Sequence, residues 1–357
     1  MTLAKAESFH PWVISIVGPA IDPEAFHAAN SPDGAWQEWT EALLKALRSK
    51  WRVGVCLLKS SEPELNLLQK RSPYAEDDLL VVLGEVKAPS LRLVCLESVN
   101  QVPIWQNDKT EAQTWQAMIS PSPLPQTGVA HFLRADIQGL VSAMADALAA
   151  LVAKVPLNGL ILAGGYSRRM QEDKALLHYH GVSQLAHSYA LLSSVCSQVL
   201  ISCREDQAEM DWPLDPVLPA LPWTYDRIPN LGPLGGILTA MMTHPQAAFL
   251  VIAVDLPWLD LATLAHLIQA RRPLGPATAF LSSSDGLPEP LCAIYEPRMR
   301  ERLFGFWGQG IICPRKALIH SATHLLALPE AFRLDNANTP SDFEAITNAL
   351  NERREIC

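Results

Sequence analysis

Strand-length apolar runs alternate with helix-length segments along most of the chain, and this alternation constrains the fold more than any other feature of the sequence. In the first half such runs stand at residues 12–17, 53–58, 79–83 and 93–96, separated by helical segments such as 35–50. Strands that alternate with helices along the chain form βαβ units, in which parallel strands lie side by side and helices cover them. The pattern therefore predicts an α/β protein with mostly parallel sheets.

The alternation is interrupted at a segment rich in Pro and Ser, residues 120–131, and it restarts at Asn158. A chain of 357 residues also exceeds the usual size of a single domain. We therefore expect two domains, residues 1–155 and residues 156–357, each with its own hydrophobic core.

The second domain should contain a strand that ends at Gly164, followed by a helix at about residues 174–194. Further strands are expected at 248–255 and 277–282, and helical segments from there to the end of the chain. These elements again alternate, so the second domain is also predicted to be α/β.

Charge and hydropathy exclude several classes of function. The formal net charge of −9 leaves no excess of Lys and Arg to displace counterions from nucleic acid, so a nucleic acid partner is not expected. We find no uninterrupted apolar run of about 20 residues that could span a membrane. Because the N-terminus lacks the features of a signal peptide, the expected location is the cytoplasm.

The stretch from Leu162 to Leu177, LAGGYSRRMQEDKALL, carries the clearest chemical signal. A strand that ends in Gly164 and Gly165 leaves backbone N–H groups open to a phosphate, and basic side chains follow directly. The spacing matches neither the Walker A loop nor the GxGxxG loop. From the residues alone, a glycine turn followed by a solvated basic helix start explains the stretch equally well.

This stretch resembles the signature LAGGxSxRMGxDKxLL of the molybdenum cofactor guanylyltransferases, within a wider superfamily of nucleotidyltransferases with a Rossmann-like fold. Three later segments, YDRIPNLGPLGGI, LVIAVDLPWLD and LDNANTPSDFEAI, resemble further family motifs and occur in the expected order. The positions that carry the resemblance are Leu162, Ala163, Gly164, Gly165, Ser167, Arg169, Lys174, Asp226, Gly232, Gly235, Asp255, Asn336 and Asn338.

The resemblance implies that GMP is transferred from GTP to molybdopterin, the precursor of the molybdenum cofactor, with release of pyrophosphate. Arg169 and Lys174 would then neutralise phosphates, and Asp255 would hold Mg²⁺. The nucleotide would lie against the backbone of Gly164 and Gly165, and Gly164 favours guanine over cytosine by family pattern. Asp226, Gly232 and Gly235 occupy family positions near the nucleotide, and Asn336 and Asn338 are candidate contacts to the pterin.

Each carboxylate and amide also has a structural interpretation. Asp255 ends an apolar strand, where ligands bind in open α/β sheets, but it could instead cap the next helix. Asp226 could be a solvated loop acid. Asn336 and Asn338 could form an Asx turn before a helix that starts at Thr339 and Pro340.

Two features depart from the family pattern. Gln171 stands where the family usually has Gly after Arg-Met, which would cost on the order of 1 kcal/mol if that position needs a positive φ. The first domain resembles the MobB-like adaptor protein that accompanies the guanylyltransferase, but no Walker A loop follows Val17 and Gly18. It is either a degenerate adaptor or an unrelated α/β domain.

Two other functions remain open from the sequence. One is a related nucleotidyl transfer that uses CTP or another phosphate acceptor. The other is a non-catalytic module that binds the cofactor and carries it to a molybdoenzyme. Whether the chain is an enzyme or a carrier, the molybdoenzyme that receives the cofactor would be its protein partner. The segment CPRKALI could bring Arg315 and Lys316 to the pterin phosphate, although a solvated helix start explains it as well.

Overall fold

A computed structural model describes residues 13–17, 34–57, 79–83, 91–96, 115–124, 129–165, 173–203, 222–228 and 230–356. The chain divides into two compact units, Met1–Lys154 and Val155–Cys357. Within these described ranges no helix has the length and apolar character needed to cross a membrane.

The first unit contains a parallel sheet whose described strands run in the order β2-β3-β1-β4-β5-β6. Helices α1 and α4 pack against one face of this sheet, where Trp39, Leu43 and Met144 join the core. The strands are β1 (Val13–Val17), β2 (Val53–Leu57), β3 (Leu79–Leu83), β4 (Leu91–Cys95), β5 (Trp115–Ser120) and β6 (Ala130–Leu133), and the helices are α1 (Gly34–Arg48) and α4 (Ile137–Val152).

The second unit is built on a mixed, mostly parallel sheet with the strand order β13-β11-β12-β10-β7-β8-β9. Strand β12 runs antiparallel to both of its neighbours, and the other pairs are parallel. The strands are β7 (Leu157–Leu162), β8 (Val199–Cys203), β9 (Trp223–Tyr225), β10 (Ala248–Ala253), β11 (Ala277–Leu281), β12 (Pro288–Tyr295) and β13 (His324–Leu326).

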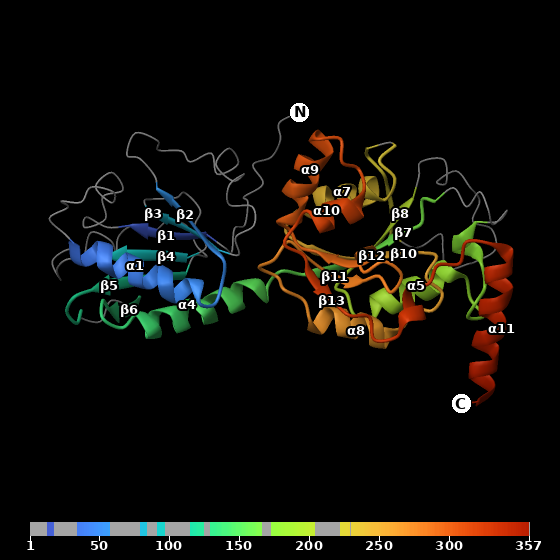
Figure 1. Cartoon of the computed structure of the whole chain (residues 1–357), viewed down its shortest axis with the longest axis horizontal. Coiled ribbons are helices and arrows are strands. Elements are labelled where there is room, and N and C mark those ends of the chain that lie inside the picture. The colour runs from blue at the N-terminus through green and yellow to red at the C-terminus, as the bar shows by residue number, and fades with distance from the viewer. Residues whose placement is uncertain are drawn as a thin grey trace. The chain divides into compact units, whose positions relative to one another are not determined.

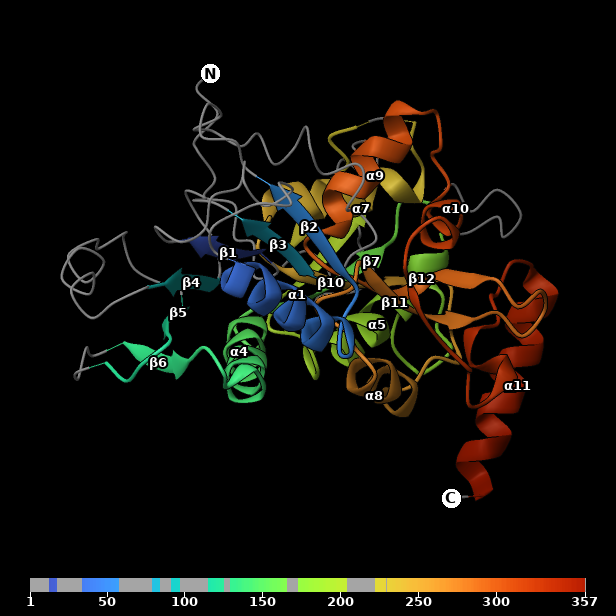
Figure 2. The same ribbon diagram turned by 60° about the vertical axis from the view of Figure 1, so that its left-hand side comes forward.

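Helices cover both faces of this second sheet (Figure 1). Helices α7, α9 and α10 lie on one face, and α5 and α8 lie on the other, an arrangement that the turned view of Figure 2 also shows. The helical elements are η4 (Lys174–Leu176), α5 (Gln184–Ser193), α7 (Pro233–Thr243), α8 (Leu261–Gln269), α9 (Met299–Gly308), α10 (Pro314–Ile319), η6 (Ala331–Leu334) and α11 (Pro340–Ile356).

The order of strands explains where a site can form. Strand β10 is completely buried and lies beside β7, with Leu160 paired to Val251 in a parallel register. Because both strands end at the same edge of the sheet, the segments after Leu162 and after Ala253 meet there. The predicted α/β fold with a mostly parallel sheet is confirmed, and each unit has its own core.

Two predicted elements differ in the structure. The single helix expected at 174–194 is divided into η4 and α5, because Gly181 has a φ of +81° and Ser183 caps a new helix by accepting the N–H of Ala186. The region after residue 282, expected to be helical, also contains β12 and β13. The apolar run in β12 is long enough only for a strand, and it pairs with β10.

Candidate active site

Three segments that are far apart in the sequence meet at the amino group of Lys174. Its Nζ donates a hydrogen bond to Asp255 Oδ2 at 2.8 Å and another to Asn338 Oδ1 at 2.6 Å. The side chains of Lys174 and Asp255 are 16 % and 19 % exposed, so water reaches the ion pair only in part. The structure thus brings together three of the residues predicted from the sequence.

Local structure holds each member of this cluster. Lys174 is the first residue of η4, which Asp173 caps by accepting the N–H of Ala175 at 3.0 Å. Asp255 follows the buried strand β10, and its carbonyl accepts the N–H of Ala337 at 3.1 Å. That backbone hydrogen bond ties the segment carrying Asn338 to the end of β10.

The alternative role of Asp255 as a helix cap does not apply. Helix α8 begins at Leu261, and its cap is Asp260, whose Oδ1 accepts the N–H of Thr263 at 2.9 Å. Within the described part of the chain, the carboxylate of Asp255 forms its hydrogen bond and ion pair with Lys174, through Oδ2. Its second oxygen can therefore receive a further cationic or donor partner.

Asp255 is the residue here that could hold a metal ion. The residues described by the structure contain no group of three or more His, Cys, Asp or Glu side chains suited to a metal. A single carboxylate still fits Mg²⁺, which often takes one or two carboxylates and fills its other positions with phosphate oxygens and water. This single carboxylate therefore suits a metal ion whose other ligands are phosphate oxygens and water.

Asn338 contacts the start of α11 through its backbone and Lys174 through its side chain. Its backbone N–H and that of Thr339 both donate to Asp342 Oδ2 at 2.9 Å, and the N–H of Asp342 donates to Thr339 Oγ1 at 3.2 Å. This reciprocal pair is a capping box at the start of α11. The helix start expected at Thr339 and Pro340 is present, while the side chain of Asn338 points to Lys174 instead of forming an Asx turn.

The carboxylate of Asp342, at this helix start, has a shifted pKa. The pKa of Asp342 lies below its ordinary value, chiefly because of the hydrogen bond from the backbone of Asn338, with those from Thr339 adding to it. The charged form of Asp342 is therefore favoured where it caps α11.

Asp226 and the predicted glycines form a second cluster, beside β8 and α7. Asp226 is partly buried, and its Oδ1 accepts a hydrogen bond from Ser202 Oγ at 2.6 Å, so it is not a fully solvated loop acid. Burial raises the pKa of Asp226, and the hydrogen bond from Ser202 opposes this rise. Gly232, with a φ of +54°, precedes α7, and Gly235 lies where a side chain would meet the carbonyl of Ile228.

The end of β7 is open where the phosphate loop was predicted. The N–H of Ala163 donates to the carbonyl of Ser202 at 2.9 Å, and the carbonyl of Leu162 accepts the N–H of Val254 at 3.2 Å. A Cβ added at Gly165 would have no atom of the described residues within 4 Å. Gly164 stands between Ala163 and Gly165 on this segment, whereas Ser167, Arg169 and Gln171 lie outside the described residues.

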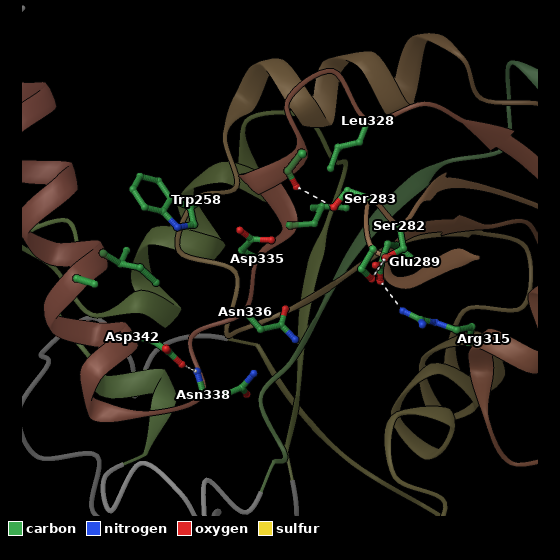
Figure 3. Close-up of a pocket in the computed structure, with 15 residues that line it drawn as sticks. Trp258, Ser282, Ser283, Glu289, Arg315, Leu328, Asp335, Asn336, Asn338 and Asp342 are labelled. Carbon is green, nitrogen blue, oxygen red and sulfur yellow. Dashed lines mark hydrogen bonds and ion pairs between the residues drawn. The ribbon is translucent and has the colours of Figure 1, made fainter. Parts of the chain in front are cut away.

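A pocket of about 510 Å³, which we call the pocket beyond Asn338, has Asn338 in its wall (Figure 3). Its walls come from the loop between β10 and α8, the connection between β11 and β12, the start of β12, helix α10, the segment before α11 and α11 itself. The lining residues are Trp258, Ser282, Ser283, Ser284, Glu289, Arg315, Leu328, Ala331, Leu334, Asp335, Asn336, Asn338, Asp342, Ala345 and Ile346. Of the residues considered from the sequence, Asn336, Asn338 and Arg315 therefore line one cavity.

Sequence analysis assigned no role to Tyr179. Its side chain is only 2 % exposed and packs edge-on against Phe343 of α11, with ring centroids 4.9 Å apart. Burial raises the pKa of Tyr179 to about 12, with smaller contributions from Asp255 and Asp342. An aromatic residue between two histidines gave no signal of burial, because its packing partner lies 164 positions away.

Comparison with known proteins identifies similar sequences for the second unit. The family model of the MobA-like NTP transferase domain matches residues 159–323. A molybdenum cofactor biosynthesis bifunctional protein from Synechocystis is 38 % identical over 196 residues, which is 55 % of this chain and 55 % of that protein. The match therefore spans only about half the length of this relative.

Other relatives are covered almost completely. A molybdenum cofactor guanylyltransferase from Pseudomonas paraeruginosa is 30 % identical over 187 residues, which is 52 % of this chain and 91 % of that protein. Among solved structures, molybdopterin-guanine dinucleotide biosynthesis protein A from Archaeoglobus fulgidus has a TM-score of 0.45 at 22 % identity, covering 55 % of this chain and 99 % of that one.

Proposed function

The chain belongs to the family of MobA-like NTP transferases, and from this premise we propose that it transfers GMP from GTP to molybdopterin and releases pyrophosphate. The names of the relatives support nucleotidyl transfer in molybdenum cofactor biosynthesis. The observation that carries the proposal is the convergence of Lys174, Asp255 and Asn338 at the edge of the sheet where β7 and β10 end.

The residues around this cluster have complementary tasks in the proposed reaction. Lys174 supplies positive charge to the phosphates of GTP, and Asn338 and Asp255 fix the position of its amino group. The open backbone after β7 and the Gly232 to Gly235 turn take the nucleotide. Asp255 would hold Mg²⁺, which would neutralise charge on the phosphoryl group that is transferred.

This reaction calls for positioning and charge neutralisation rather than a covalent intermediate. The phosphate of molybdopterin attacks the α-phosphorus of GTP, the bond from that phosphorus to the bridging oxygen breaks, and pyrophosphate leaves. The pocket beyond Asn338 takes the pterin, with Asn336 and Asn338 as contacts. Arg169 is a further proposed phosphate ligand, on the evidence of the sequence motif.

The first unit is a proposed degenerate MobB-like adaptor. Its described strands form an all-parallel sheet, and no Walker A sequence follows β1. We therefore assign it no GTP hydrolysis, and we propose that it binds a client molybdoenzyme that receives the cofactor.

Pyrophosphate release tests the proposed reaction. Purified protein is given Mg²⁺, molybdopterin and either GTP or CTP, and the same assay is run on Lys174→Ala and Asp255→Asn. Lys174→Ala removes a positive charge that stabilises the phosphates, and Asp255→Asn removes the negative charge proposed to hold Mg²⁺ beside them, so release should fall at least about 100-fold in each case. Lys154→Ala and Asp146→Asn, which change exposed residues of the same types, should leave the rate unchanged.

The outcomes separate the candidate functions. Release with GTP that both site substitutions abolish supports the guanylyltransferase. Release with CTP alone would assign the chain to a cytidylyl transfer, and nucleotide binding without any release would favour a cofactor carrier.

A further inference from the structure

The pocket beyond Asn338 has a chemical character that differs from a phosphate site. Arg315 is the one basic side chain among the described residues that line it, and three carboxylates, Glu289, Asp335 and Asp342, face the same space. None of the glycines of the predicted nucleotide loops belongs to its lining. Such a pocket suits a neutral ligand rich in hydrogen-bond donors more than a second phosphate group.

Two of the three carboxylates already have partners. Arg315 donates from Nη2 to Glu289 Oε2 at 3.0 Å and from Nη1 to Asp285 Oδ2 at 2.9 Å, so its charge is balanced within the protein. Asp342 accepts the backbone N–H groups of Asn338 and Thr339 in the capping box. Each of these two carboxylates has one oxygen engaged, which leaves Asp335 as the lining carboxylate with neither oxygen hydrogen-bonded to a described residue.

Asp335 is held in place by its backbone while its carboxylate faces the pocket. Its N–H donates to the carbonyl of Phe332 at 3.0 Å, and no donor among the described residues reaches its side chain. In Figure 3 the carboxylate lies between Trp258 on one side and Ser283 and Glu289 on the other. Asp335 is exposed as a residue, and the partial desolvation of its carboxylate raises its pKa.

Trp258 gives this part of the pocket a fixed aromatic wall. Its ring packs edge-on against Phe332 with centroids 5.4 Å apart, and its carbonyl accepts a hydrogen bond from Arg333 Nη1 at 3.3 Å. A flat heterocycle can contact such a ring while its edge meets a nearby carboxylate.

We propose that Asp335 determines the specificity of the pocket by accepting two hydrogen bonds from a 2-amino-4-oxopyrimidine edge, one from the amino group and one from the adjacent ring N–H. Pterins and guanine share this edge, and the inference, which rests on the proposed function, assigns it to the pterin of the acceptor. The reason is position: the pocket includes Asn336 and Asn338 but none of Gly164, Gly165 and Gly235. The paired N–H donors match the two carboxylate oxygens.

Binding of two small pteridines tests this assignment without any catalytic turnover. The probes are pterin and lumazine, in which an oxo group replaces the 2-amino group, and their dissociation constants are measured by calorimetry or fluorescence on the full chain. A carboxylate rejects the oxo group, so the native protein should bind pterin at least about tenfold more tightly than lumazine.

The substitution Asp335→Asn should remove this preference or reverse it, because an amide can donate to the oxo group of lumazine. The preference should persist in Asp146→Asn, which makes the same change on the exposed surface of α4. Matching unfolding curves for the native protein and Asp335→Asn would show that the loss is not a folding defect.

Three results would overturn the proposal. They are equal binding of pterin and lumazine by the native protein, a pterin preference that survives in Asp335→Asn, and no saturable pterin binding in the millimolar range. Guanine carries the same 2-amino-4-oxopyrimidine edge, so the binding of GTP is compared in parallel with that of ITP, which lacks the 2-amino group. If Asp335→Asn alters the GTP preference instead, the base of the nucleotide occupies the pocket and the pterin assignment is wrong.

These measurements are independent of pyrophosphate release. A chain that transfers nucleotides without pterin discrimination would retain the proposed function and lose this inference. A chain that prefers pterin to lumazine without releasing pyrophosphate would retain this inference and lose the proposed function.

Discussion

At the scale of single residues, Gly235 shows how closely the α7 turn is packed. An added Cβ would lie 2.9 Å from the carbonyl oxygen of Ile228 and 3.4 Å from Asp226 Oδ2. Gly235→Ala should therefore destabilise the protein by about 1–3 kcal/mol in denaturant unfolding, because backbone atoms must move. Gly305→Ala in α9 is the matched control: an added Cβ there would meet no atom of another described element within 4 Å, so we expect stabilisation by about 0.5–1 kcal/mol. Equal effects of the two substitutions would contradict the packing argument.

At the scale of elements, α11 depends on its capping box. Asp342→Ala should lower the melting temperature at neutral pH, since the N–H groups of Asn338 and Thr339 lose their acceptor. The pKa of Asp342 is lowered in the folded state, so its contribution is present above its ordinary value of 3.8 and is lost as the pH falls through the lowered pKa. The difference from the native protein should thus vanish in acid, and Glu344→Ala, an exposed change on the same helix, should show no such pH dependence. A difference that persists unchanged at low pH would exclude this role.

At the scale of the whole molecule, the two units have separate cores. Ile14, Leu43 and Met144 belong to the core of the first unit, and Phe249 and Tyr295 belong to that of the second. We therefore expect a shortened chain that begins at Val155 to fold and to release pyrophosphate at a rate close to that of the full chain. The complementary piece that ends at Lys154 should release none. An aggregated or inactive second unit would mean that the first unit supports its fold or its site.

Part of this architecture could be read from the sequence because it depends on local signals. The β-branched and apolar residues of β1, β7 and β10 predict buried strands from neighbouring positions alone. The glycines after Leu162 and the Thr339-Pro340 pair likewise predict a turn and a helix start. The prediction of a single helix at 174–194 was wrong for an equally local reason. Gly181, with its positive φ, lies between η4 and α5, and Ser183 caps the start of α5.

The remaining features were decided by pairing between distant segments. Lys174 lies 81 positions from Asp255 and 164 from Asn338, and they meet because β10 pairs with β7 while the Asp255 carbonyl binds Ala337. No local pattern shows that Tyr179 packs on α11, or that Glu289 and Asp342 are engaged while Asp335 is not. The sequence by itself therefore determined the elements and the kinds of residue at the site, because propensity and hydrophobic periodicity act over a few residues. Only the tertiary structure decided which side chains face one another, because strand order and loop packing result from contacts across the whole unit.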